Sequence, residues 1–443
     1  MADKIILRTF ADRMLIYNLG AMLVRQSYRL VWACPPVQRF LGRRYPKLLK
    51  HVMGQQGLTE TVAAAMSGNA KPVCWFHAAS FGEYNVIRPI VKQIRKDDVC
   101  IVVTFFSSTG YEMLTAQNKR TNEADHVFYL PLDTTSNARR FLDLLKPQKA
   151  VFAISEYWMN HLNELKARHI PTYIVSMLVG NGSYLLKWYG FPLRKALRAV
   201  STFMVLDEPS RQNLGRMGFT NVVVTGDPLF DNAIAIAREP YHNTIVERFC
   251  GGSRQVFVAG SISDQKDLGL VAALANANRD VRFIVVPHEI GQENLKAIVG
   301  QMGGRALLYS QCSDATSFDG VQTLVVDSLG SLARLYRYGS WAYVGGGFTP
   351  YLHSVIEPVV YGIPVVFGPR IERKRTPQQM ISLGVGAMVE TESSLLTWFD
   401  GMRHPETLQA ARTRAAAYVD SNANATMTVV EEIKKTRNKK IKL

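Results

Sequence analysis

Two glutamates near the ends of apolar runs are candidates for chemistry. Glu83 ends the segment WFHAASFGE (residues 75–83), and Glu156 follows the run KAVFAIS. A carboxylate at such a place can act as a general base and take a proton from an attacking hydroxyl group. Ser80 and Glu83 also have the spacing of a helix capping box, and spacing alone favours this structural role for Glu83 over a catalytic one. For Glu156, the position does not decide between holding substrate hydroxyls and starting a helix beside a favourable dipole.

A glycine-rich segment, VGGGFTPYLHSVIEP (residues 344–358), has the composition of a phosphate-binding loop. Its three glycines let the backbone approach a ligand, and a helix starting near Ser354 would offer free amides to a phosphate. Ser354 and Glu357 again have capping-box spacing, whereas Glu357 could instead accept both hydroxyls of a ribose. His353 is either a ligand contact or a packed loop residue. Weaker candidates follow other apolar runs, namely Gly260, Ser261, Pro287, His288 and residues 327–331.

Apolar runs that alternate with amphipathic segments must position these residues. One series starts at Pro72 with VCWFH and VCIVVTF, and a second starts after residue 252 with QVFVAG and VRFIVVP. Such alternation predicts parallel strands with crossover helices, and therefore an α/β protein with two doubly wound domains. Ligands of such sheets bind at the carboxyl ends of strands, in the crevice between the domains. The expected parts are an N-terminal segment 1–50, a Rossmann-like domain 51–235, a linker 236–252, a second Rossmann-like domain 253–415, and a C-terminal helix with a basic tail, 416–443.

The charge balance and the cysteines restrict the kind of partner. The chain of 443 residues has a formal net charge of +16, which calls for an anionic partner such as nucleic acid, phospholipid or a phosphorylated substrate. Its five cysteines are scattered without the spacing of a metal site, which favours reduced thiols in a cytosol. The histidines form no metal-protease pattern and no calcium loop is present, so we expect no metal site.

The N-terminal segment has the pattern of a membrane contact. Residues 14–24, MLIYNLGAMLV, are uncharged and are flanked by arginines, but they are too few for a spanning helix, which needs about 20 apolar residues. We expect an interfacial amphipathic helix whose apolar face, with Leu15, Leu19, Met22 and Leu23, enters the lipid while arginines meet anionic headgroups. The alternative is a helix packed on its own protein.

Taken together, these segments resemble the 3-deoxy-D-manno-octulosonic acid (Kdo) transferases of lipopolysaccharide assembly. The similarity covers most of the chain and is carried by HAASFGE, SSTG (107–110), YLPLD (129–133), EYWMN (156–160), GDPLFD (226–231) and the HSVIEP to VVFGP segment. It implies a GT-B fold, CMP-Kdo as donor, a lipid A precursor (lipid IVA) as acceptor, and inversion at the anomeric carbon without metal or cofactor. It also implies a place at the cytoplasmic face of the bacterial inner membrane and no nucleic-acid partner.

The resemblance assigns roles to individual positions. Glu83 matches the family's catalytic base, with Ser80 and Glu156 as acceptor-binding or electrostatic residues. The chain departs from the family pattern where Ile154 replaces a carboxylate, where Met159 replaces a proline, and where Leu206 or Asp207 replaces a glutamine, which suggests a divergent branch. The positions that match CMP-binding segments, or lie beside them, are Ser261, Pro287, His288, Leu329, Gly330, Ser331, Gly346, Gly347, His353, Ser354, Val355, Ile356 and Glu357.

Three other functions stay open on the sequence. A dehydrogenase with two Rossmann domains would need a G-x-G-x-x-G motif that opens a helix after an N-terminal strand, and the chain has none. A non-catalytic protein that binds anionic lipid or nucleic acid is suggested by the charge of +16. Another GT-B transferase with a different nucleotide sugar is the alternative nearest to the Kdo transferases.

Overall fold

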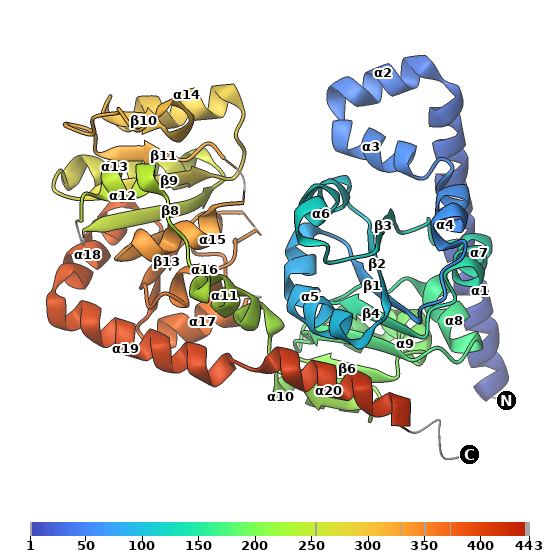
Figure 1. The fold of residues 1–443 in the computed structure, drawn as a ribbon. Coiled ribbons are helices and arrows are strands. Elements are labelled where there is room, and N and C mark those ends of the chain that lie inside the picture. Colours follow the sequence, from blue (N-terminus) through green and yellow to red (C-terminus); the bar gives the residue numbers. More distant parts are fainter. Residues whose placement is uncertain (1, 253–254, 329, 350, 373, 439–443) are drawn as a thin grey trace. The chain divides into compact units, whose positions relative to one another are not determined.

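The computed structural model describes residues 2–252, 255–328, 330–349, 351–372 and 374–438. The chain forms two compact units: unit 1 contains Met1–Leu229 and Asn424–Leu443, and unit 2 contains Phe230–Ala423. Each unit has one sheet of seven strands with helices on both faces (Figure 1). The two doubly wound α/β domains predicted from the alternating runs are therefore present.

The sheet of unit 1 has the strand order β3-β2-β1-β4-β5-β6-β7, and every neighbouring pair is parallel. All residues of β1, β2 and β5 are buried, because a parallel sheet covered by helices on both faces leaves no side exposed. The strands are β1 (Val73–Ala78), β2 (Cys100–Phe105), β3 (His126–Tyr129), β4 (Lys149–Ala153), β5 (Thr172–Met177), β6 (Thr202–Val205) and β7 (Val222–Val224).

Two apolar layers hold helices against this sheet. One layer, which includes Trp75 and Phe152, takes up side chains of α4, α7, α8, α9 and α10, and the other, which includes Phe76 and Val151, takes up α5, α6 and α20. The helices are α1 (Ala2–Ala33), α2 (Pro35–Arg44), α3 (Pro46–Gly54), α4 (Leu58–Met66), α5 (Phe81–Ile94), α6 (Ser108–Thr121), α7 (Thr135–Leu145), α8 (Met159–Ala167), α9 (Phe191–Leu197), α10 (Glu208–Arg216) and α20 (Ala425–Asn438).

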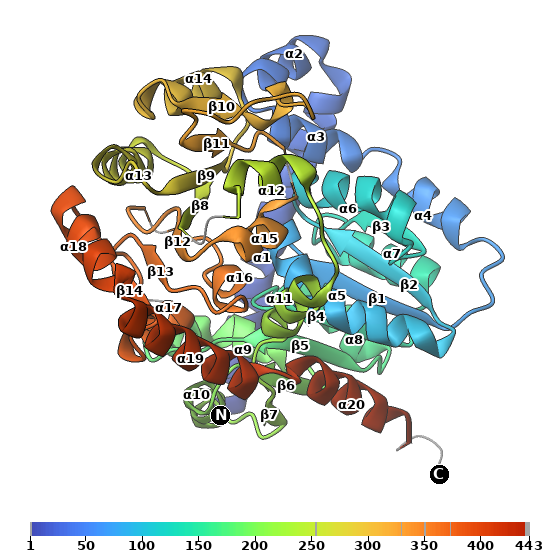
Figure 2. The same cartoon turned by 60° about the vertical axis from the view of Figure 1, so that its left-hand side comes forward.

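Unit 2 repeats this architecture with the strand order β10-β11-β9-β8-β12-β13-β14, again all parallel (Figure 2). Its strands are β8 (Val256–Ile262), β9 (Arg282–Pro287), β10 (Ala306–Leu308), β11 (Thr323–Val325), β12 (Trp341–Val344), β13 (Val365–Phe367) and β14 (Gly386–Met388). Its helices are α12 (Thr244–Cys250), α13 (Gln265–Ala277), α14 (Gln292–Gln301), α15 (Leu332–Leu335), α16 (Ile356–Val359), α17 (Arg375–Ser382), α18 (Glu392–Arg403) and α19 (Pro405–Asn422), and α11 (Pro228–Arg238) leads into the unit.

The segments expected to link and to end the chain belong to these units. Residues 236–252 contain the end of α11 and all of α12, whose Val246 and Phe249 are buried. Residues 416–443 contain the end of α19 in unit 2 and then α20, which returns to unit 1 and buries Val429 and Ile433 against its sheet.

Helix α1 lies along unit 1. Met14 and Tyr17 pack against the layer that contains Trp75, while Tyr28 and Val31 form a small cluster with Val52 of α3. Among the described residues, no helix is both long enough and apolar enough to cross a membrane.

Candidate functional site

The loop between β1 and α5 places Glu83 at the carboxyl end of a central strand of unit 1. Ser80 is the N-cap of α5, and its hydroxyl oxygen accepts a hydrogen bond from the Glu83 backbone N–H at 3.3 Å. The Glu83 carboxylate accepts from the backbone N–H of Ala79 at 2.6 Å. The serine half of the expected capping box is therefore present, and the Glu83 carboxylate interacts with the backbone of Ala79 as well as with that of Ser80.

Glu83 is held in a form that exchanges a proton near neutral pH. Burial, followed by the charge of Glu156, raises the pKa of Glu83 from 4.5 to about 7, although hydrogen bonds from Ala79 and Ser80 oppose the rise. A general base works best when its pKa lies near the working pH. The structure thus brings Glu83 and Glu156 into electrostatic contact and gives Glu83 a pKa near neutral pH.

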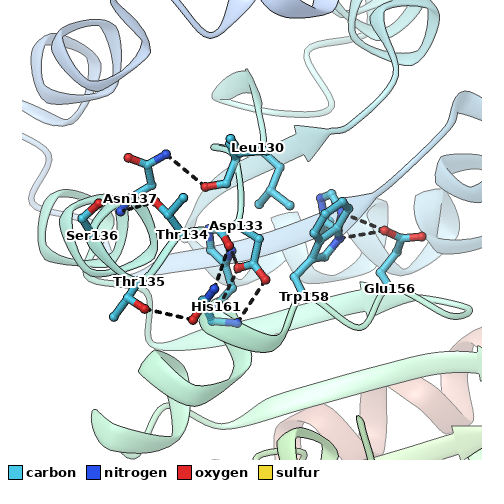
Figure 3. Close-up of polar contacts among 12 residues, drawn as sticks. Leu130, Asp133, Thr134, Thr135, Ser136, Asn137, Glu156, Trp158 and His161 are labelled. Carbon is cyan, nitrogen blue, oxygen red and sulfur yellow. Dashed lines mark hydrogen bonds and ion pairs between the residues drawn. The ribbon is translucent and has the colours of Figure 1, made fainter. Parts of the chain in front are cut away.

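Glu156 is positioned by an aromatic pair. The indole N–H of Trp158 donates to the Glu156 carboxylate at 2.7 Å (Figure 3). The same nitrogen lies 2.9 Å from Nε2 of His77. His77 lies fully buried in β1 with Nδ1 3.1 Å from the carbonyl oxygen of Thr104, and burial lowers its pKa. Nε2 of the same ring lies 3.3 Å from the Glu156 carboxylate, so each ring nitrogen of His77 faces an oxygen that only accepts hydrogen bonds.

The sequence analysis missed His77 and Trp158. Both stand inside segments that it singled out, since His77 belongs to WFHAASFGE and Trp158 follows Glu156 by two residues. Their contact depends on β1 lying beside β4, which the runs of apolar residues do not specify. The available signal was a polar aromatic residue close in sequence to a candidate carboxylate: His77 within an apolar run before Glu83, and Trp158 two residues after Glu156.

Backbone strain marks the same edge of the sheet. Ile154, directly after β4, has a φ of +56°, and Ser176 near the end of β5 has a φ of +59° beside an irregularity in the strand register. A β-branched residue in the left-handed region is a conformational outlier, and such strain collects at functional sites. Ile154 is the position where the resemblance noted above implies a carboxylate, and here the strained residue carries an apolar side chain.

A second buried cluster fixes the segment that carries Trp158. One oxygen of the Asp133 carboxylate accepts from Nδ1 of His161 at 2.6 Å (Figure 3). The other oxygen accepts from the Tyr17 hydroxyl at 2.6 Å and from the Asn160 backbone N–H at 3.1 Å. Burial alone would raise the pKa of Asp133, but the His161 contact and the hydrogen bonds bring it below its ordinary value. Asp133 therefore stays ionised and joins α1, the loop after β3 and the start of α8.

In unit 2, the predicted nucleotide-binding residues gather around the ends of β8 and β12. Ser261 sits at an irregularity near the end of β8 with a φ of +56°. The buried carboxylate of Asp267 accepts from the Tyr343 hydroxyl at 2.7 Å and from the Gly346 backbone N–H at 3.0 Å. This carboxylate, which the sequence analysis did not select, fixes the glycine loop next to the strained turn.

The glycines of this loop are required by contacts within the protein. A Cβ atom on Gly346 would lie 2.4 Å from the carbonyl oxygen of Tyr351, and one on Gly347 would lie 2.7 Å from the carbonyl oxygen of Gly368. Both have a positive φ, of +93° and +87°. Close approach of two loops therefore explains these glycines, where the sequence had suggested close approach to a ligand.

Several polar groups around this loop have no partner within the described part of unit 2. The rings of His288 and His353 lie 4.4 Å apart, and burial, helped by the charges of His288 and Lys374, lowers the pKa of His353 to about 4. The hydroxyl groups of Ser331 and Ser354 are buried without a hydrogen bond. Such unsatisfied buried groups are uncommon and mark places where a ligand can supply the missing partner.

Glu357 and its helix differ from the expectation. The helix α16 begins at Ile356, its N-cap Val355 has no capping side chain, and the Ser354 hydroxyl makes no bond, so the capping box predicted for Ser354 and Glu357 is wrong. Burial raises the pKa of Glu357 to about 7. A helix of four residues also offers little dipole to a phosphate.

The other predicted residues lie nearby or outside the described chain. Pro287 is the last residue of β9, and Gly330, with a φ of +84°, precedes Ser331 at the start of α15. Val355 and Ile356 are buried, and Leu329 lies outside the described residues. No group of three or more histidine, cysteine, aspartate or glutamate side chains in the described ranges could hold a metal ion.

Comparison with known proteins places these motifs in context. Residues 55–232 match the sequence model of a family described as "3-Deoxy-D-manno-octulosonic-acid transferase (kdotransferase)". The chain is 24% identical to the 3-deoxy-D-manno-octulosonic acid transferase of Chlamydophila psittaci, with 80% of this chain and 81% of the relative covered. It is also 24% identical to that of Bordetella pertussis, with 84% and 89% covered.

Solved structures show the same fold at low identity. A putative UDP-N-acetylglucosamine 2-epimerase from Listeria monocytogenes superposes with a TM-score of 0.60 and 12% identity, covering 84% of this chain and 98% of that one. MurG from Acinetobacter baumannii superposes with a TM-score of 0.52 and 15% identity, covering 82% and 99%. With the two parallel sheets, these likenesses confirm the predicted GT-B fold class.

Proposed function

We propose that this chain transfers Kdo from CMP-Kdo to the lipid A precursor lipid IVA. The premise is that it is a homologue of the Kdo transferases and a glycosyltransferase of lipopolysaccharide biosynthesis. The observation that carries the proposal is the position of Glu83, half-buried at the end of β1 beside Glu156, with a pKa of about 7. A carboxylate of that acidity can take a proton from an alcohol as the alcohol becomes a nucleophile.

The reaction follows from that one proton transfer. Glu83 accepts the proton of the acceptor hydroxyl, whose oxygen forms a new bond to the anomeric carbon of Kdo on the face opposite the leaving group. The bond from that carbon to the phosphate oxygen breaks, its electron pair leaves with CMP, and the anomeric configuration inverts. The phosphate of CMP departs as a stable anion, so the step needs neither a general acid nor a bound metal ion.

Each unit supplies a separate part of this chemistry. In unit 1, burial raises the pKa of Glu83, and the Glu156 carboxylate, to which Trp158 donates a hydrogen bond, raises it further. In unit 2, the unpartnered hydroxyls of Ser331 and Ser354 and the neutral ring of His353 offer hydrogen bonds to a cytidine nucleotide, and Glu357 offers an acceptor to ribose hydroxyls.

We place the enzyme at the cytoplasmic face of the inner membrane, with α1 in contact with anionic lipid. The side chains of Leu15, Leu19, Met22 and Leu23 are between 51% and 72% exposed, on a helix whose other side packs against unit 1. An apolar stripe of this kind lies well at a lipid–water boundary.

The test is a transfer assay with labelled CMP-Kdo and a tetra-acylated lipid A precursor. We expect Glu83→Ala to lower kcat about 10²- to 10⁴-fold, the usual contribution of a general base, while CMP binding in unit 2 stays unchanged. Glu112→Gln is the matched control, because this carboxylate of the same unit is exposed and pairs with Lys50. Turnover that persists in Glu83→Ala would remove Glu83 from the mechanism.

A transferase for another nucleotide sugar is the second candidate, because Ile154 and Met159 depart from the family pattern. The same assay with UDP-sugars decides between them. Tighter binding of UDP than of CMP to the full chain would favour that candidate.

A further inference from the structure

Unit 1 contains a cavity that the proposed reaction does not use. It opens between α1, α4 and α7, has a volume of about 180 Å³, and lies wholly within unit 1. Three arginines line it: Arg25 and Arg29, one turn apart on α1, and Arg140 on α7. Glu60 is the one carboxylate among the lining residues, so these side chains carry a net charge of +2.

The polar groups of this cavity divide into those that build its wall and those left for a ligand. The indole N–H of Trp32 donates to the Val52 carbonyl, and the Gln55 side chain bonds to the Leu130 carbonyl, so both are occupied. The Tyr28 hydroxyl, on a side chain only 9% exposed, has no hydrogen-bond partner among the described residues.

The arginines are also available. Arg25 donates to the Ser136 hydroxyl at 3.3 Å, and within the described ranges none of Arg25, Arg29 and Arg140 forms an ion pair. Guanidinium groups bind the oxygens of phosphate in pairs, and one unengaged hydroxyl adds a further donor. A net charge of +2 matches a phosphate monoester, which carries close to two negative charges at neutral pH.

The position of the cavity indicates where such a phosphate would come from. Met22 and Arg29 are seven residues apart on α1 and therefore lie on the same side of the helix. Met22 belongs to the exposed apolar stripe, together with Leu15, Leu19 and Leu23, and Leu30 of the same helix is exposed too. The charged rim of the cavity thus adjoins the apolar stripe, as the headgroup of a lipid adjoins its chains.

We propose that this cavity binds the phosphate-monoester headgroup of a membrane lipid whose chains lie along the apolar stripe of α1. The inference rests on the membrane contact proposed above for α1 and adds to it a defined headgroup site. Contact through surface charge alone would accept any anionic lipid, whereas a cavity with three guanidinium groups prefers the monoester.

The experiment measures binding of the full chain to phosphatidylcholine vesicles that contain phosphatidic acid, a monoester, or phosphatidylglycerol, a diester, at matched surface potential. We expect the wild type to prefer phosphatidic acid, and Arg140→Gln to lower that preference about tenfold through the loss of a charge-assisted hydrogen bond. Arg139→Gln is the matched control, because this arginine lies on the same helix outside the cavity lining and pairs with Glu164. We expect it to keep the preference.

Other results of these binding experiments would overturn the headgroup site, the membrane contact or the lipid source separately. Equal binding to both vesicle types, or equal losses in Arg140→Gln and Arg139→Gln, would overturn the headgroup site and leave the membrane contact standing. No binding to any vesicle would overturn both. Saturable binding of inorganic phosphate to the lipid-free chain that is lost in Arg140→Gln, without any lipid preference, would overturn the lipid source. None of these measurements depends on CMP-Kdo or on turnover.

Discussion

Replacing Glu83 with glutamine should stabilise the protein in a way that depends on pH. Glutamine keeps an oxygen that can accept the hydrogen bond from the Ala79 backbone N–H. It removes the ionisable group from a half-buried site in which burial and the charge of Glu156 oppose ionisation. The substitution therefore removes an unfavourable charge and retains the local cap.

The size of the effect comes from the pKa of Glu83 in the two states. The value rises from 4.5 to about 7 on folding, so the folded protein binds more protons than the unfolded chain between those pH values. Stability then falls as pH rises through this window, by about 1.36 kcal/mol for each pH unit. Above pH 7 the ionised carboxylate destabilises the fold by about 3 kcal/mol relative to its protonated form.

We expect Glu83→Gln to match the wild type in stability at pH 4.5 and to exceed it by up to about 3 kcal/mol at pH 8. The assay is native-state hydrogen exchange of the amides of β1, β2 and β4, which reports the stability of unit 1 by itself. The same variant should have lost transfer activity. A gain in stability that is equal at the two pH values, or a loss at pH 8, would refute the reasoning, because it would mean that Glu83 ionises as easily in the fold as in water.

Two other substitutions test the surroundings of the base. Glu156→Gln should lower the pKa of Glu83 and move the acidic limb of the kcat profile to lower pH, by roughly one pH unit at most because burial is the larger cause; a pH profile that does not move would contradict this electrostatic contact. Tyr17→Phe removes a donor from the buried Asp133 carboxylate and should destabilise unit 1 by about 2 kcal/mol, with faster hydrogen exchange in α1 after residue 14; unchanged exchange there would mean that this bond does not hold α1.

Much of the fold follows from the sequence because parallel sheets leave a clear pattern. Strands buried on both faces read as short continuous apolar runs, and VCWFH and VCIVVTF coincide with β1 and β2. The attachment of α20 could not be predicted in this way. An amphipathic pattern shows that Val429 and Ile433 are buried, but it does not show that they are buried on unit 1, which the chain left some 190 residues earlier.

The sequence was enough to identify residues of the candidate site, but not to predict their pKa values or their contacts. Spacing identified Ser80 and Glu83 as a cap, and the structure has the serine half of that cap. Spacing could not give the pKa of Glu83, which depends on burial and on a carboxylate more than 70 residues away in sequence. For Ser354 and Glu357 the same spacing was misleading, because α16 starts only at Ile356 and the Ser354 hydroxyl caps no backbone N–H.

Unfavourable features in both units occur where parallel strands end. Ile154 after β4 and Ser261 near the end of β8 hold a left-handed backbone that costs about 1–2 kcal/mol for a residue with a Cβ. In unit 1 the strained residue, Ile154, lies two positions before Glu156 in the sequence. The charge of Glu156, together with burial, makes ionisation of Glu83 unfavourable. In unit 2 it lies beside the loop fixed by Asp267. Packing of a core gives no reason for strain and unfavourable charge to occur together at strand ends, and their coincidence supports the proposal that Glu83 transfers a proton there.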